Sequence, residues 1–328
     1  MKRNLITPAF SLDAPVGMDR GPNANAPGVI CAANEARFTS THYSEPLTGY
    51  TVGWRDPENL DELNARLFPE ISHGRMGEFK AATNADEWLS DTDDERAIGA
   101  SFKRVERKGT TVLFKTQNRG LTVRVDHDEV DALDGNWQEM YVGWLLRRLA
   151  RSRLKRGIAL IDAAATNANR TWTGANPDGL LRTTLKATAD ATGMRANVVV
   201  FGEAAWDLRL DVYEPANTPY AARAASMSPA ELATKLMVDR VEVVKARYQS
   251  AASAKTNVIG SVVYHYYAEM GQMKDDPSNV KRFVTSARGG VRNGVYVQEH
   301  EKFTDISVEA YDVILIASSL GVRKDTVS

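Results

Sequence analysis

Residues Asn136–Asn169 read NWQEMYVGWLLRRLARSRLKRGIALIDAAATNAN, and this stretch decides the architecture of the chain. Apolar residues recur along it at helical spacing, and no proline interrupts them. At ~1.5 Å per residue, a helix of roughly thirty residues is about 45 Å long. We therefore predict one long helix over 136–168, with Asp134 or Asn136 as its N-cap, which serves as a spine for the other elements.

The middle of this spine helix is strongly basic. Its cationic side chains are Arg147, Arg148, Arg151, Arg153, Lys155 and Arg156. Such a run either contacts nucleic-acid phosphates or is the solvated side of a helix. The sequence favours neither interpretation over the other.

Composition describes a folded protein without an unusual charge. The chain has 328 residues, 43% hydrophobic and 25% charged, with a formal net charge of -1. This length predicts two or three subdomains, and the near-neutral balance argues against a dedicated nucleic-acid-binding module. Cys31 is the only cysteine, which excludes an intramolecular disulfide and a cysteine zinc site. Neither a targeting signal nor an apolar run of ~20 residues occurs, so we expect a cytoplasmic product and no membrane partner.

Helices and strands alternate irregularly along the chain, which predicts the α+β class. Residues 1–55 are rich in Pro, Gly, Asn and Ser, and form either a disordered tail or an arm that orders on a neighbouring subunit. Asp56-Pro57 predicts a short helix that continues to about Leu67. Strands are expected over 71–82 and 110–116, on either side of a long charged excursion.

After the spine, turn and cap signals mark further elements. Asn176-Pro177 begins a predicted helix that ends near Gly193, and Ser228 begins another with a capping box. Asn293-Gly294 is typical of a type I′ hairpin turn. Further strands are expected over 121–125, 197–201, 241–246, 258–267, 280–286 and 306–316, and a further helix over 203–211.

The charged excursion between the two strands is a candidate interface. Its charged side chains are Asp91, Asp93, Asp94, Glu95, Lys103, Arg104, Arg107 and Lys108. The acidic run lacks the alternate ligands and central glycine of a calcium loop, so a charge-matched interface or a solvated face explains it better than a bound cation. A connection of this length is usually functional or disordered.

The usual signatures of catalysis are missing from the sequence. The five histidines are scattered, and phosphate-binding glycine motifs and a Gly-x-Ser-x-Gly elbow do not occur. We therefore predict no catalytic, cofactor-binding or metal site. The run Asp126-His127-Asp128-Glu129 leaves a metal-dependent enzyme as a minor alternative, although a solvated loop explains it better.

The order of segments resembles the major capsid proteins of tailed bacteriophages, the HK-97-like fold, from about Asp56 to Val322. No single motif is diagnostic, and the co-linear series carries the resemblance. The matching segments are Leu67-Phe68-Pro69 after the short helix, 71–117 as a two-stranded extended loop, Leu145 to Arg156 as the arginine-rich spine, Trp172 with Asn176-Pro177-Asp178, Thr192-Gly193 to Val200 with Ala196 in place of the family's proline, Ser228 to Tyr248, and Asp305 to Gly321.

This resemblance implies an organisation for the whole chain. It implies an N-terminal arm (1–55), a short helix leading to the extended loop (56–70), an extended β-hairpin loop (71–118), a peripheral domain with the spine helix (119–173 and 289–328) and an axial domain (174–288). Lys80, Lys103 and Lys108 lie in the region where some members form covalent cross-links, but none aligns with the reactive position, so no covalent chemistry is predicted.

The resemblance also implies a structural function without catalysis. The expected protein self-assembles through hexamers and pentamers into an icosahedral shell around double-stranded DNA, which it contacts without sequence specificity. It is expected in the virion after assembly in the host cytoplasm, with separate scaffolding, portal and decoration proteins. The alternative is an encapsulin-like bacterial compartment that encloses protein cargo; encapsulins usually have a shorter N-terminal region, so the arm favours the phage.

Overall fold

The structure is a computed structural model that describes residues 42–81, 94–96, 98–102, 104, 109–130, 135–216, 218–251, 253–269 and 273–328. Within these residues the helices are α1 (Glu45–Gly53), α2 (Leu60–Leu67), α3 (His127–Val130), α4 (Trp137–Ala164), α5 (Pro177–Thr192), α6 (Glu203–Tyr213), α7 (Pro219–Ala225) and α8 (Pro229–Leu236). The strands are β1 (Glu70–Ser72), β2 (Met76–Ala81), β3 (Thr110–Lys115), β4 (Gln117–Asp126), β5 (Thr166–Arg170), β6 (Val198–Gly202), β7 (Arg240–Val244), β8 (Arg247–Ala251), β9 (Ala254–Asn257), β10 (Val262–Tyr266), β11 (Val280–Thr285), β12 (Asn293–Glu299), β13 (Phe303–Ile316) and β14 (Arg323–Val327).

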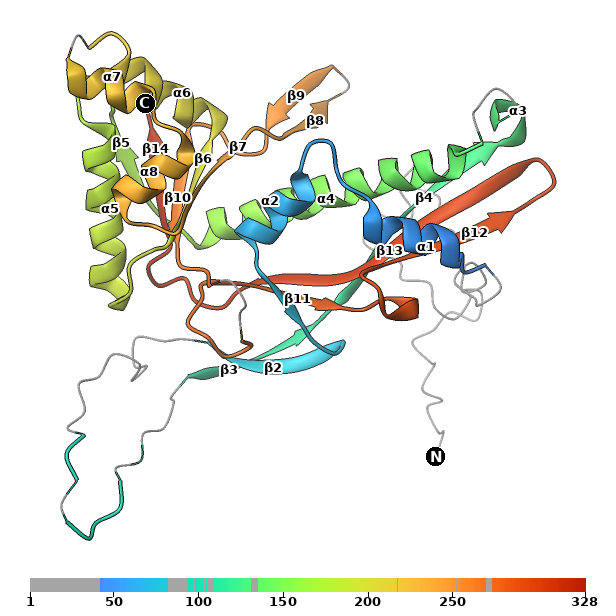
Figure 1. Cartoon of the computed structure of the whole chain (residues 1–328), viewed down its shortest axis with the longest axis horizontal. Coiled ribbons are helices and arrows are strands. Elements are labelled where there is room, and N and C mark those ends of the chain that lie inside the picture. Colours follow the sequence, from blue (N-terminus) through green and yellow to red (C-terminus); the bar gives the residue numbers. More distant parts are fainter. Residues whose placement is uncertain are drawn as a thin grey trace, which may run out of the picture.

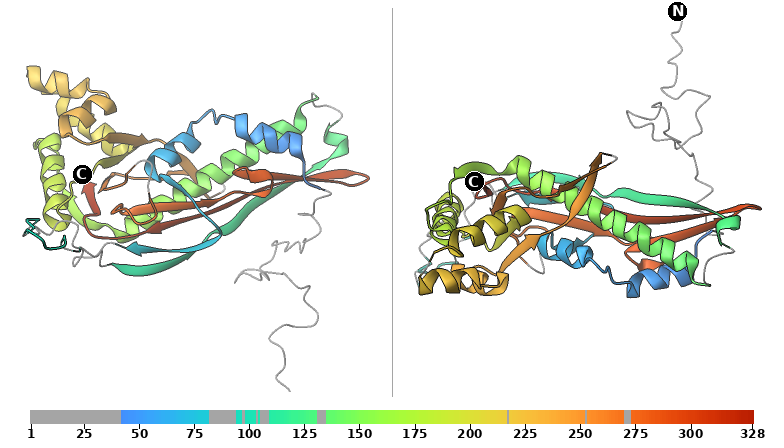
Figure 2. Two further views of the ribbon diagram at one scale, coloured as in Figure 1. Left: turned by 60° about the horizontal axis from the view of Figure 1, so that its bottom comes forward. Right: turned by 90° about the horizontal axis from the view of Figure 1, so that it is seen from above.

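Helix α4 is the predicted spine, and it runs lengthwise over the long strands of the molecule (Figures 1 and 2). It has 28 residues and ends at Ala164, so the predicted end at residue 168 is wrong. The chain turns extended at Ala165 because the next five residues pair with β14 as the parallel strand β5. Asn136 occupies the N-cap position but makes no side-chain capping bond, and Asp134 lies outside the described residues.

The first sheet has the order β1-β11-β13-β12, and β4 pairs with the other edge of β13. Strand β13 has 14 residues, and its two halves pair with β12 and β11 along one edge. The N-terminal half of α4 packs on this sheet through a core that includes Val142, Leu145, Val295 and Ile306. This burial of one helix stripe against one sheet face fixes the spine along the sheet.

The predicted hairpin turn at Asn293-Gly294 is wrong. These two residues begin β12 and pair with Ala310 and Glu309. The hydrogen-bonded pairing of β12 with β13 outweighs the local turn preference of Asn293-Gly294. The hairpin turns instead between Glu299 and Phe303.

The second sheet has the order β5-β14-β10-β6-β7 and lies at one end of the molecule among α5, α6 and α8 (Figure 1). Its two faces are both covered, because alternate residues of β6 belong to different cores. Val199 and Phe201 pack with α5, α6 and α8. Val198 and Val200 pack with the C-terminal half of α4. Burial on both faces explains why β6 is apolar throughout.

Each sheet joins strands from both expected ranges, and the assignment of peripheral and axial domains stays a prediction. Strands β5 and β14 were expected in the peripheral part, yet both belong to the second sheet. Strand β11 was expected in the axial part, yet it pairs with β1 and β13 of the first sheet. These pairings join segments far apart in sequence, which the sequence pattern alone does not reveal.

The extended loop begins as an antiparallel pair of β2 and β3, with the register running from Met76↔Lys115 to Ala81↔Thr110. The predicted pairing is confirmed, but the strand expected over 71–82 is two strands, because β1 pairs with β11 instead. The inward face of the hairpin packs on the first sheet, where the rings of Phe114 and Phe283 stack with centroids 3.7 Å apart.

The N-terminal region contains a helix that the sequence pattern did not reveal. Helix α1, capped by Ser44, lies within the expected arm and packs Leu47 into the core beneath α4. Helix α2 begins at Leu60 rather than at Pro57, because the Asp56 carboxylate accepts the backbone N–H groups of Glu58 and Leu60 in a preceding turn. In contrast, the capped starts of α5 and α8 and the end of α5 at Gly193 are confirmed.

Candidate functional site

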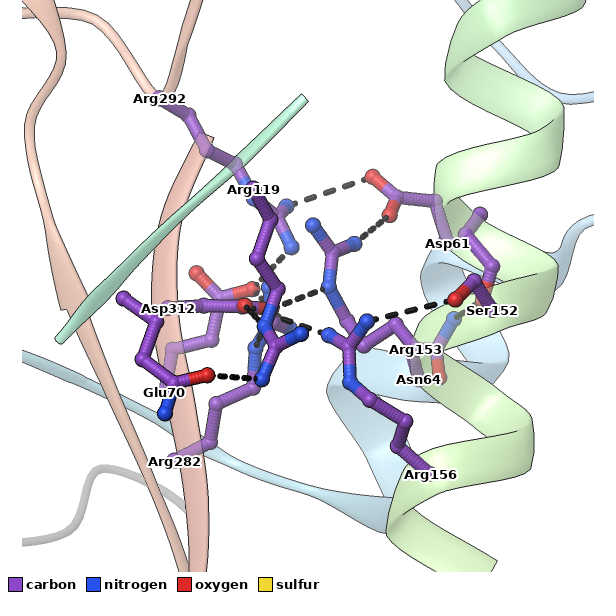
Figure 3. Close-up of polar contacts among 12 residues, drawn as sticks. Asp61, Asn64, Glu70, Arg119, Ser152, Arg153, Arg156, Arg282, Arg292 and Asp312 are labelled. Atoms are coloured by element: carbon purple, nitrogen blue, oxygen red, sulfur yellow. Dashed lines mark hydrogen bonds and ion pairs between the residues drawn. The ribbon is translucent and has the colours of Figure 1, made fainter. Parts of the chain in front are cut away.

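The strongest concentration of charged side chains surrounds Asp312 on β13 (Figure 3). The side chain of Asp312 is only 2% exposed. Its Oδ2 accepts from Arg153 Nε at 2.8 Å and lies 3.8 Å from Arg282 Nε. Its Oδ1 lies 3.3 Å from Arg156 Nη2 and 3.4 Å from Arg119 Nε. One buried carboxylate therefore faces four guanidinium groups from three elements, the helix α4 and the strands β4 and β11.

Two further carboxylates complete this group. Asp61 on α2 accepts from Arg153 Nη1 at 2.9 Å and from Arg292 Nη1 at 3.3 Å. Glu70 on β1 accepts from Arg282 Nη1 at 2.7 Å and lies 2.5 Å from Arg292 Nη2. We call the eight side chains the arginine cluster: Asp61, Glu70, Arg119, Arg153, Arg156, Arg282, Arg292 and Asp312.

The arginine cluster shifts the ionisation of its own members. Burial alone raises the pKa of Asp312, but the charges of Arg153 and Arg282 outweigh this and hold that pKa below its usual value. Burial, reinforced by the like charges of Arg153 and Arg292, lowers the pKa of Arg282 to about 9. Burial also lowers the pKa of Arg156, although Asp312 opposes it. The cluster thus holds an ionised carboxylate among crowded cations.

The structure places the basic residues of the spine mainly in intramolecular contacts. Arg147 lies 3.4 Å from Asp56, and Arg151 donates to Glu58 at 2.8 Å. Arg153 and Arg156 belong to the arginine cluster, and the side chain of Arg153 is only 6% exposed. These guanidinium groups are therefore paired within the chain, and the contact of the basic run with nucleic acid stays a prediction.

The two remaining basic positions of the spine lie against aromatic rings. The guanidinium of exposed Arg148 lies 4.7 Å from the centroid of Trp144, and Lys155 Nζ lies 3.8 Å from the ring centroid of Tyr248. Both are cation–π contacts. The acidic residues Asp56, Glu58 and Asp61 could have indicated partners for the basic run in the sequence. Their pairing with the arginines becomes visible only where α2 and the turn before it dock on α4.

The charged residues of the extended loop are only partly described. Asp94, Glu95 and Arg104 are exposed to solvent. Five of the predicted interface residues lie outside the described residues: Asp91, Asp93, Lys103, Arg107 and Lys108. Their role as an interface stays a prediction.

The acidic run around His127 does not form a metal site in the structure. His127 Nε2 lies 2.9 Å from the hydroxyl of Thr304, and the Asp126 carboxylate accepts the backbone N–H of Asp128. Among the described residues, no group of three or more His, Cys, Asp or Glu side chains is placed to hold a metal ion. The run is therefore the end of β4 followed by the short helix α3.

A second buried ion pair lies at the end of the molecule that contains the second sheet. Asp178 on α5 and Arg209 on α6 are both fully buried and make two hydrogen bonds, at 2.8 and 3.1 Å. Lys235 on α8 donates to the same carboxylate at 2.6 Å. Burial raises the pKa of Asp178, but the hydrogen bonds and charges of Arg209 and Lys235 have the larger effect, so this pKa lies below its usual value. This contact joins helices α5, α6 and α8, which pack on one face of the second sheet. The sequence analysis did not predict it.

These shifts predict an acid-sensitive fold. The pKa values of Asp178, Asp312 and Asp325 all lie below their usual values; for Asp325, hydrogen bonds from His265 and Thr184 outweigh burial. A lowered folded-state pKa contributes stability that is complete above the unfolded value of ~3.9 and is lost as the pH falls through the folded value. We expect the midpoint of urea unfolding to fall between about pH 5 and about pH 2. An unchanged midpoint over this range would contradict the prediction.

Comparison with known proteins identifies the fold. No family model and no curated protein matches the chain. Among solved structures, a phage-related protein from Bordetella bronchiseptica RB50 is similar with a TM-score of 0.62 and 17% identity, over 87% of this chain and 96% of that chain. The spine helix α4 and the β2–β3 hairpin were expected from the sequence, whereas the division into two sheets was not. The chain has an HK-97-like fold.

Other solved structures resemble this HK-97-like chain at lower scores. One is a virus-like particle from Pyrococcus furiosus, with a TM-score of 0.48 and 10% identity over 87% of this chain and 99% of that chain. Another is the capsid of the cyanophage P-SCSP1u, with a TM-score of 0.49 and 11% identity over 80% and 86% of the two chains.

In the part of the HK-97-like chain that the structure describes, no helix combines the length and the apolar character needed to cross a membrane.

Proposed function

We propose that this chain is the major capsid protein of a tailed bacteriophage. It self-assembles through hexamers and pentamers into an icosahedral shell that encloses double-stranded DNA, and its role is structural rather than catalytic. The observation that carries the proposal is an HK-97-like fold whose extended hairpin leaves apolar side chains uncovered. In this proposal the protein resides in the virion, and scaffolding, portal and decoration proteins are separate chains.

The two faces of the β2–β3 hairpin differ in what covers them. The inward residues, such as Phe79 and Phe114, are buried against the first sheet. On the outward face, Met76 and Leu113 are 65% and 78% exposed. Within the described residues no further strand pairs with β2 or β3, although the backbone N–H of Lys80 donates to Asp275 Oδ1 at 2.8 Å. Exposed apolar side chains and strand edges without a further strand favour burial against another subunit.

Charge supports the same function. Within the extended loop, Asp94 is exposed, and an exposed carboxylate suits a weak ion pair with a neighbouring copy. The net charge of -1 suits a wall that encloses DNA without binding it tightly. Weak contacts repeated around a closed shell permit correction of misplaced subunits and still hold the shell together.

Electron microscopy and light scattering of the purified protein, expressed alone, test this proposal. We expect closed shells, or hexamers and pentamers that close when pH or salt is changed. Packaged nucleic acid supports the phage capsid, whereas enclosed protein cargo supports the encapsulin-like alternative. A compact monomer under every condition, also in the presence of candidate scaffolding protein, would contradict self-assembly.

A charge on the outward hairpin face is expected to block assembly without unfolding the subunit. Leu113→Glu changes an exposed side chain, so the free energy of unfolding should change by less than about 0.5 kcal/mol. The buried carboxylate that would result at a subunit contact should shift the light-scattering profile from shells to free subunits. Leu113→Ile is the matched control and should assemble normally. Normal shells formed by Leu113→Glu would remove this face from the interface.

A further inference from the structure

The arginine cluster contains more positive than negative charge. Among the described residues, its five guanidinium groups are ion-paired with three carboxylates, those of Asp61, Glu70 and Asp312. The side chain of Arg282 is fully buried, so its charge cannot be compensated by bulk water. Buried charges are costly unless they are paired and hydrogen-bonded, and an excess of two cations is therefore unfavourable in the isolated chain.

Unused hydrogen-bond donors accompany this excess. Arg282 Nη2 is buried and has no hydrogen-bond partner among the described residues, and its Nε lies 3.8 Å from Asp312, too far for a hydrogen bond. Arg119 Nε is also buried, and its contact with Asp312 Oδ1 at 3.4 Å is an ion pair without hydrogen-bond geometry. The like charges of Arg153 and Arg292 add to the effect of burial in lowering the pKa of Arg282. The unsatisfied N–H donors and the excess positive charge would therefore both be stabilised by one additional anionic acceptor.

The arginine cluster remains accessible from outside. The side chains of Arg119, Arg156 and Arg292 are 31%, 30% and 30% exposed. They come from β4, α4 and the segment just before β12, and Figure 3 shows cluster guanidinium groups gathered around Asp312. An anion that arrives from solvent can therefore meet arginines from three separate elements.

We propose that the arginine cluster binds a phosphate-class oxyanion, either free inorganic phosphate or a phosphate of nucleic acid. Several oxygens on one compact anion match the planar, multiple N–H donors of guanidinium groups, and this pairing is the one that arginine favours. The negative charge offsets the excess of the cluster. The bound anion would link the sheet, the spine helix and the β11–β12 connection. The inference concerns this cluster alone and does not depend on the proposed capsid function.

Phosphate titration of the full chain tests the site. In chloride buffer of constant ionic strength, added inorganic phosphate should raise the thermal unfolding midpoint to a plateau, because a ligand that binds only the folded state stabilises it by mass action. Calorimetry should show saturable binding. The double variant Arg119→Gln/Arg156→Gln removes two accessible donors and should lose both responses. Arg151→Gln is the matched control on the same helix, since Arg151 pairs with Glu58 outside the cluster, and it should respond like the unchanged protein.

If the double variant does not fold, Arg119→Gln alone provides the comparison, with phosphate affinity expected to fall about tenfold or more. Short duplex DNA distinguishes the two sources: displacement of phosphate supports nucleic-acid phosphate, and no displacement supports the free anion. The proposal is overturned if phosphate gives no saturable response beyond that of chloride. It is equally overturned if a folded variant of the cluster responds as strongly as the Arg151→Gln control.

Discussion

Replacement of Asp312 by alanine is expected to lower the free energy of unfolding by about 3–5 kcal/mol, because it leaves buried guanidinium groups without their shared carboxylate. The carboxylate of Asp312 has four guanidinium groups within 4 Å, those of Arg119, Arg153, Arg156 and Arg282. Urea unfolding of the unassembled protein, followed by circular dichroism, measures the loss. The effect should be large because the change increases an existing excess of positive charge.

The matched control for this prediction is Glu58→Ala. Glu58 also pairs with a spine arginine, Arg151, but both side chains are substantially exposed. Solvent screens such a pair, so the control should cost only about 0–1 kcal/mol. Equal losses for Asp312→Ala and Glu58→Ala would show that the cluster does not depend on its central carboxylate.

Replacement of Phe68 by alanine should also cost about 3–5 kcal/mol, because it removes a large side chain from a core that cannot fully collapse. Phe68 is 0% exposed and packs in the cluster that contains Leu154 and Ile158 of α4. Its ring lies directly against the backbone of α4 at Gly157, where an added Cβ would come within 2.2 Å of Phe68 Cζ. The close approach of α2 and α4 therefore depends on this ring and this glycine together.

A double-mutant cycle separates this packing from a general loss of core. Gly157→Ala alone should destabilise by about 1–3 kcal/mol, because the added methyl group clashes with the buried ring. In the Phe68→Ala background the same methyl group enters the vacated space, so its cost should vanish or become a gain. Urea unfolding of the four proteins gives the coupling energy. Additive effects of the two substitutions would refute the proposed contact.

Several elements could be predicted from the sequence because their signals are local. The apolar repeat of α4, the capped starts of α5 and α8, and the apolar strand β6 involve residues within a few positions of one another. The mistakes arose where a distant partner outweighed a local preference. The residues expected at the end of α4 form strand β5 instead, which pairs with β14. Asn293-Gly294, expected as a turn, lies in strand β12 and pairs with β13.

The candidate site shows the same division. The basic run of the spine was visible in the sequence, but its partner Asp312 lies 159 positions from Arg153. Whether a guanidinium faces a carboxylate, an aromatic ring or solvent depends on which side of α4 it occupies and what packs there. The pattern of charges could not distinguish a nucleic-acid contact from an internal ion-pair network.

The sequence by itself determined the long helix, the extended hairpin, the α+β class and the order of segments that resembles the HK-97-like fold. These features follow from periodicity, caps and chain order, which act over short distances. Only the tertiary structure decided which sheet receives β5, β11 and β14, and which arginines surround Asp312. The physical reason is that long-range strand pairing and burial of charge depend on contacts between segments that the sequence keeps far apart.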